Sequence, residues 1–170
     1  MKLVVVAVFS FFLAEIGHTE WVSMVFPQSE MKVLVQKDLA IPVGKRVKPS
    51  HAFHFAYQDY LKGHYGLALS GFQQFIADFP ESSMTPQAYY YLGECYEQQG
   101  NLKEVERALI TILEAHSTSR QVPAALFKLG NVMAKVGDSY MAKVYWNKLI
   151  KDFRESPEAK LASSRINRIP

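Results

Sequence analysis

The sequence has very little cysteine, little net charge and no apolar run long enough to span a bilayer. A single cysteine, Cys95, stands among 170 residues, so the chain can form neither an internal disulfide nor a zinc site built from several thiolates. Lysine and arginine exceed aspartate and glutamate by only three, 19 against 16. This surplus does not support nucleic-acid binding through bulk charge, because many phosphates would need neutralising. The remaining composition, 49% hydrophobic and 13% aromatic, is typical of a globular domain with one core.

The first nineteen residues have the pattern of a secretory signal peptide. Lys2 precedes a run from Leu3 to Ala14 that is apolar except for Ser10, and Glu15 ends it. Twelve helical residues span about 18 Å, well short of the ~30 Å hydrocarbon layer of a bilayer. A basic start and a short apolar core predict export, with cleavage before Glu20. No cysteine follows for lipid attachment, so we expect a soluble exported product. The alternative is a buried strand or helix.

Residues 20–50 carry no pattern that predicts chemistry. Two short apolar runs, 21–26 and 31–35, are separated by Pro27 and followed by Pro42 and Pro49. They are compatible with a hairpin, with an extended arm packed on the domain, or with a linker. We therefore treat residues 20–50 as an N-terminal arm or linker.

A 37-residue period organises the rest of the chain. Glycines recur at this interval, as do small residues seven positions earlier and large apolar residues nine positions later. The three columns are Gly63, Gly100 and Gly137; Ala56, Gly93 and Gly130; and Phe72, Leu109 and Trp146. Apolar residues at helical spacing on both sides of each glycine indicate two helices joined by a turn. The period predicts an all-α, right-handed α-solenoid of three helical hairpins within residues 51–168, closed by a capping helix at about 157–167.

Glycine and proline mark the ends of the expected helices. A glycine at each turn fits because a helix commonly ends on a residue in the left-handed conformation. Pro86, Pro123 and Pro157 are expected to be the first helical residues of the following helices, because the missing N–H of proline would be unpaired there. Ser156 is the expected N-cap of the last helix.

These columns resemble the tetratricopeptide repeat. Its pattern of a small residue, a glycine and large apolar residues matches Ala56, Gly63 and Phe72 in the first unit, and their counterparts in the next two units. The period is three residues longer than the usual 34. The resemblance implies a protein-binding scaffold.

The chain more closely resembles the C-terminal domain of the YbgF (CpoB) family of Tol-Pal system proteins. The resemblance lies in residues 56–82, 88–101, 123–130 and 156–162, and covers about residues 51–165. It implies a periplasmic, non-catalytic adaptor that binds TolA-like proteins or the cell-wall synthesis machinery and coordinates envelope constriction with cell-wall synthesis during division. The chain departs from the family in two ways: residues 20–50 show no coiled-coil heptads, and Arg154 stands where a proline closes the third repeat.

No arrangement of residues predicts catalysis, a cofactor or a metal. His51 and His54 lie one helical turn apart without a carboxylate at a matching step. Cys95 is expected to be a buried, inert thiol. Glu94 and Glu97, one turn apart, could form an acid/base pair, but on a lone repeat helix such a pair usually indicates a solvated face.

The first helices of the hairpins are expected to line a concave groove that binds a polypeptide. The candidate groove residues are Phe53, Tyr57, Tyr60, Tyr90, Glu94, Glu97, Phe127, Asn131 and Lys135. Tyrosine is favoured at interfaces for its large rigid area and its hydroxyl. The alternative for Phe53 and Tyr57 is that residues 20–50 fold back and cover them.

The sequence therefore predicts a periplasmic adaptor of the Tol-Pal type that acts through this groove. Two other functions remain open: a scaffold for outer-membrane protein assembly, and a regulatory subunit of a cell-wall enzyme. Self-association without a partner is a further possibility, and the oligomeric state stays unassigned.

Overall fold

The structure is a computed structural model that describes residues 47–169. Within these residues the chain forms seven helices and no strand. The helices are α4 (Pro49–Leu61), α5 (Tyr65–Asp78), α6 (Thr85–Gln98), α7 (Leu102–Ala115), α8 (Val122–Val136), α9 (Ser139–Asp152) and α10 (Pro157–Ile166). The expected signal peptide at 1–19 and residues 20–46 of the expected arm lie outside the described part and stay predictions.

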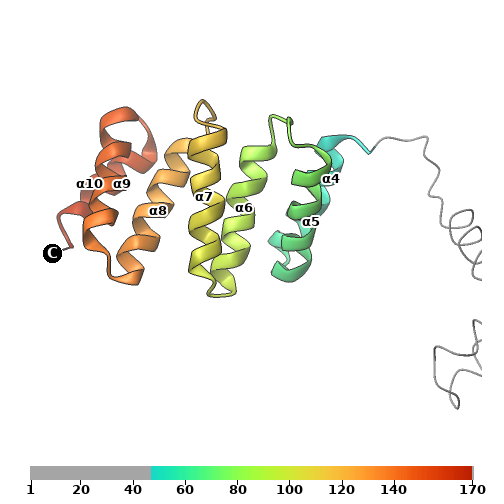
Figure 1. Ribbon diagram of the computed structural model, residues 1–170, viewed down its shortest axis with the longest axis horizontal. Helices are drawn as coiled ribbons and strands as arrows, with labels where there is room; N and C mark the ends of the chain where they lie inside the picture. Colours follow the sequence, from blue (N-terminus) through green and yellow to red (C-terminus); the bar gives the residue numbers. More distant parts are fainter. Residues whose placement is uncertain (1–46, 170) are drawn as a thin grey trace, which may run out of the picture. The chain divides into compact units, whose positions relative to one another are not determined.

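Six of the helices pair into three hairpins that stack in chain order (Figure 1). Hairpin 1 is α4 with α5, hairpin 2 is α6 with α7, and hairpin 3 is α8 with α9. Each hairpin also packs its first helix on the second helix of the preceding hairpin, and α10 packs on α9 in the same way. The expected α-solenoid of three hairpins plus a C-terminal helix is confirmed.

The glycine column lies in the turns inside the hairpins. Gly63, Gly100 and Gly137 have φ angles of +78°, +75° and +90°, and they are the residues with positive φ in the described chain. A side chain in this left-handed region would clash with its own backbone, so glycine is required for the tight reversal.

A second column, which the sequence analysis missed, organises the connections between hairpins. Serine recurs every 37 residues, and its N–H donates to the carbonyl of the C-cap residue, which directly follows the previous helix. These hydrogen bonds are Ser82 to Phe79 (3.1 Å), Ser119 to His116 (2.9 Å) and Ser156 to Phe153 (2.9 Å). The next proline follows Ser156 at once but comes four residues after Ser82 and Ser119. The three extra residues account for the period of 37 in place of 34.

Two of the expected helix starts are wrong by one residue. Helices α6 and α8 begin at Thr85 and Val122, so Pro86 and Pro123 are second rather than first helical residues. The reason is that the N–H groups of Thr85 and Val122 donate to the carbonyls of Ser82 and Ser119, which starts helical bonding one residue earlier. Pro157 is first in α10, and the Ser156 hydroxyl accepts from the Ala159 N–H at 3.1 Å, as expected for the N-cap.

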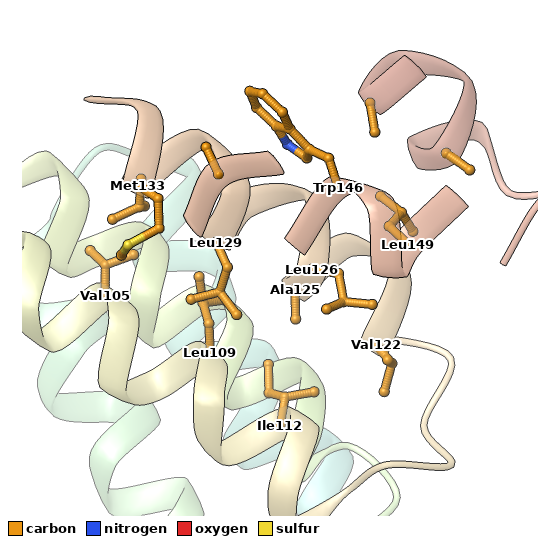
Figure 2. Close-up of a cluster of buried hydrophobic side chains, with 14 residues drawn as sticks. Val105, Leu109, Ile112, Val122, Ala125, Leu126, Leu129, Met133, Trp146 and Leu149 are labelled. Atoms are coloured by element: carbon orange, nitrogen blue, oxygen red, sulfur yellow. The ribbon is translucent and has the colours of Figure 1, made fainter. Parts of the chain in front are cut away.

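The core consists of two apolar clusters, and their border falls inside hairpin 2. The first is formed by α4, α5 and α6, and its largest members are Phe53, Phe72 and Phe75. The second is formed by α7 to α10 around Trp146, and Figure 2 shows how Leu109, Leu126 and Leu129 lie together within it.

The small-residue column marks the close approach of the two helices of a hairpin, but to different degrees. A Cβ added at Gly130 would lie 2.2 Å from Nε1 of Trp146, so only glycine fits beneath the indole. The same atom at Gly93 would meet Leu109 at 3.7 Å, which is an ordinary contact. In hairpin 1 the glycine stands on the second helix, where a Cβ on Gly71 would approach that of Ala56 to 2.8 Å.

Candidate functional site

Side chains of the first helices connect one hairpin to the next along one side of the array. The Tyr60 hydroxyl on α4 donates to Oε2 of Glu94 on α6 at 3.2 Å, and Glu94 in turn pairs with Lys128 on α8. Arg165 on α10 donates to Oδ1 of Asn131 at 3.0 Å. All three pairs are 34 residues apart. We call this side, with the side chains that bridge α4, α6, α8 and α10, the inner face.

Lys128 lies at the centre of a charge cluster on the inner face. Its Nζ contacts the carboxylate of Glu94 and, at 2.5 Å, Oε2 of Glu97. Lys135 lies 3.7 Å from the other oxygen of Glu97. Only 12% of the Lys128 side chain and 18% of the Glu94 side chain are exposed. The hydrogen bond from Lys128 lowers the pKa of Glu97 below its ordinary value, against the opposing effect of burial.

This cluster changes the interpretation of Glu94 and Glu97. The sequence favoured a solvated carboxylate pair, but both are ion-paired to a cation from the next hairpin. Lys128 was not among the candidate residues, because its partners stand 31 and 34 residues earlier, off the 37-residue columns. The carboxylates therefore tie α6 to α8 through Lys128.

Tyrosine rings dominate the inner face at α4 and α6. Tyr57 and Tyr60 stack along α4 with centroids 6.1 Å apart, and Tyr91 of α6 packs against both, at 4.9 and 5.0 Å. Tyr90 points toward the charge cluster, where Lys128 Nζ lies 6.0 Å from its ring centroid. Burial and the nearby Glu94 carboxylate raise the pKa of both Tyr60 and Tyr90, so these hydroxyls stay protonated donors. Tyr57, Tyr60 and Tyr90 are half-buried.

Phe53 is a core residue and not part of this surface, which corrects the sequence expectation. It is 5% exposed and its ring lies 5.5 Å from Phe72 and 5.6 Å from Phe75, because position 53 of α4 faces α5. Tyr91, which the sequence analysis left out, takes its place beside Tyr57. The run of three tyrosines at 89–91 was a signal in the sequence. The sequence alone did not fix the rotation of the helix, which decides which of the three rings faces Tyr57.

The C-terminal end of the inner face is cationic. The Arg165 guanidinium from α10 lies 5.2 Å from the ring centroid of Phe127 and also donates to Asn131. Phe127 and Asn131 are therefore brought together as expected, and both contact an arginine from the C-terminal helix α10. Lys135, one turn beyond Asn131, has 56% of its side chain exposed.

Metal ligands and the one cysteine were the remaining candidates for chemistry in the described residues. Residues 47–169 contain no cluster of three or more histidine, cysteine, aspartate or glutamate side chains that could hold a metal ion. Cys95 is buried, and burial raises the pKa of its thiol to about 11, so the thiolate is scarce at neutral pH. Of the helices in this part of the chain, none is both long and apolar enough to cross a membrane.

A separate surface pocket of about 660 Å³ lies between two of the inter-hairpin connections. It is lined by residues 80–84 and 118–120, with Pro86, Ala115 and His116. The hydroxyls of Ser82 and Ser119 in its wall already accept hydrogen bonds from the N–H groups of Met84 and Gln121. These two hydroxyls are therefore already engaged within the turns, and we assign the pocket no role.

Comparison with known protein families agrees with this architecture. The tetratricopeptide repeat model matches residues 87–119 and 124–156, which correspond to hairpins 2 and 3 with the start of each following connection. No curated protein matches the sequence. Tetratricopeptide repeats are generally non-catalytic scaffolds for protein–protein interactions. Hairpins 2 and 3 thus resemble tetratricopeptide repeats both in sequence and in their helical architecture.

Proposed function

We propose that this protein is an adaptor that holds a partner polypeptide on its inner face. The observation that carries the proposal is the set of half-buried tyrosines, Tyr57, Tyr60 and Tyr90, on two adjacent first helices beside a charge cluster. Tyrosine brings a large contact area at a low cost in side-chain entropy. The inner face therefore combines an aromatic area for affinity with charges that discriminate between partners.

The charge cluster makes this face preorganised. Lys128 ties α6 to α8 through both Glu94 and Glu97, and Tyr60 ties α4 to α6 through Glu94. A surface whose helices are already fixed loses little conformational freedom when a partner binds. The exposed Lys135 and the Arg165 guanidinium then remain as the cations nearest to a bound segment.

We further propose that the adaptor works in the periplasm as part of a Tol-Pal type system. Two sequence features support this: the basic and apolar leader at residues 1–19, and the resemblance to the YbgF (CpoB) family in residues 56–82 and 88–101. The partner would then be a TolA-like protein or a component of the cell-wall synthesis machinery.

The binding proposal can be tested with the full chain and the periplasmic part of a TolA protein. The paired substitution Tyr57→Ala with Tyr90→Ala should weaken binding by about 2 kcal/mol or more, roughly 30-fold, if these rings are interface anchors. Leu67→Ala, at a 63% exposed site on the second helix α5, is the control and should leave binding unchanged. Equal affinities for the wild type and the paired variant, with unchanged helical circular dichroism, would remove the inner face from the proposal.

The location needs its own experiment. Residues 1–25 fused to a reporter enzyme that is active only after export should give activity in the periplasmic fraction. Leu3→Arg with Val6→Arg interrupts the apolar core of the leader and should abolish that activity. Full activity in the interrupted fusion would contradict the export proposal while leaving the inner face untouched.

A further inference from the structure

The outer side of the array is formed by the exposed stripe on the second helix of each hairpin. Because the hairpins repeat every 37 residues, each stripe position can be compared between hairpins. The stripes are Gly66, Ser70, Gln74 and Ala77 on α5; Lys103, Arg107, Thr111 and Glu114 on α7; and Tyr140, Val144, Lys148 and Lys151 on α9. On α9 this stripe faces away from the buried Ala142, Trp146 and Leu149.

Only the stripe of hairpin 3 carries large apolar side chains. Tyr140 is 76% exposed and Val144 is 40% exposed, and they lie one helical turn apart. Val136, which ends α8 four residues before Tyr140, is 54% exposed. Its counterparts in hairpins 1 and 2 are Lys62 and Gln99. Hairpins 1 and 2 thus fold with polar or small residues at these positions, so folding does not require apolar side chains there.

The same end of the chain is strongly basic. Residues 120–169 contain ten lysines and arginines against four aspartates and glutamates, a net charge of +6, whereas residues 47–119 contain four against eight, a net charge of −4. Lys148 and Lys151 continue the stripe from Val144 toward the end of α9. Lys148 pairs with Asp152 at 2.9 Å, and Lys151 adds a further positive charge beside that carboxylate.

We infer that the outer stripe of α9 is a second docking surface, for a helical protein segment with apolar side chains one turn apart and acidic side chains beside them. Tyr140 and Val144 would contact the apolar side chains, as in other helix-binding surfaces. Lys148 and Lys151 select an acidic partner by charge complementarity. Because this stripe lies on second helices and the inner face on first helices, one chain can hold two proteins at once, and this inference stands without the proposed function.

The test uses the full chain and a fluorescent synthetic helix as the probe. The probe has 18 residues, with leucine on one face at three- and four-residue spacing and glutamate elsewhere, and a control probe carries lysine in place of glutamate. We expect the acidic probe to bind at least tenfold more tightly than the basic one, and more weakly as salt rises. Backbone amide shifts in the NMR spectrum should change in α9.

Two paired variants separate the apolar contacts from the charges. Tyr140→Ser with Val144→Ser removes the apolar side chains without changing the charge, and Lys148→Thr with Lys151→Glu gives α9 the residues that hairpin 2 carries at these positions. Each pair should weaken binding of the acidic probe at least tenfold. Tyr57→Ala with Tyr90→Ala on the inner face should leave it unchanged.

Three results would overturn the inference. The first is equal binding of the acidic and basic probes, and the second is undiminished binding by both exchanged variants with normal circular dichroism. The third is binding to phosphatidylglycerol vesicles, lost in Tyr140→Ser with Val144→Ser, without binding of the acidic probe. That result would assign the stripe to a membrane surface instead.

Discussion

Gly93 and Gly130 occupy the same column, yet the two positions differ in the space around them. A Cβ at Gly130 would overlap the Trp146 indole, whereas at Gly93 it would make ordinary contacts with Leu109 and Ala108. We expect Gly130→Ala to lower the free energy of unfolding by about 2 kcal/mol through overpacking. Gly93→Ala is the matched control and should raise it by up to about 1 kcal/mol, since alanine favours a helix. Urea unfolding of both variants measures this, and equal losses would contradict the geometry.

The carboxylate of Glu97 gives the stability of the protein a pH dependence of known sign. Its pKa is lowered in the folded state by Lys128, relative to about 4.3 in an unfolded chain. Its contribution is therefore complete above about pH 5 and is lost as the pH falls through the folded pKa. The decrease in the free energy of unfolding between pH 6 and pH 3 should be smaller in Glu97→Gln than in the wild type. Glu114→Gln, at an exposed site on α7, should retain the wild-type decrease.

At the scale of residues, the sequence predicted columns better than it predicted contacts. Ala56, Gly93 and Gly130 could be assigned to helix crossings because small residues recur at one interval. Lys128 could not be found in this way, since its pairing with Glu94 depends on how α8 is rotated against α6. Phe53 was misplaced for the same reason, because one helical position separates the inner face from the core.

At the scale of elements, capping distinguishes the last helix from its equivalents. Ser156 caps α10 directly, so Ser156→Ala should lower the free energy of unfolding by about 1 kcal/mol. Ser164→Ala is the control within the same helix, because the Ser164 hydroxyl donates to the Leu161 carbonyl and caps no backbone N–H. It should be neutral or slightly stabilising, because alanine has the higher helix propensity. Thermal or urea unfolding of the two variants checks this, and an equal loss in both would remove the capping argument.

The helices themselves were largely predictable from the sequence, because apolar spacing and turn glycines agree in all three hairpins. The first residues of α6 and α8 were less predictable. Their turns begin at Ser82 and Ser119, three residues before the helices, and the sequence analysis considered proline rather than serine as the marker. Boundaries fixed by backbone hydrogen bonds outside a helix leave little trace in its own residues.

At the scale of the whole molecule, the two apolar clusters should open separately. In a repeat array each unit contacts only its neighbours, so a local loss of packing stays local. Phe72→Ala, at a fully buried position in the first cluster, removes about 3–5 kcal/mol of packing. We expect amide hydrogen exchange in α4 and α5 to become at least a hundredfold faster, with α8 and α9 changed by less than threefold. Leu129→Ala in the second cluster should give the reverse pattern, and uniform acceleration in both variants would show one cooperative unit instead.

The border between the clusters also has a mechanical consequence. Tyr89 and Tyr96 of α6 are the half-buried rings that touch both clusters at this seam, and Lys128 adds ion pairs from α8 to α6. Under tension applied to the ends of the array, we expect the seam to yield before either cluster does. A polypeptide bound along the inner face from Tyr57 to Lys135 would cross the seam and hold its two sides together. An occupied adaptor should therefore resist stretching more than an empty one.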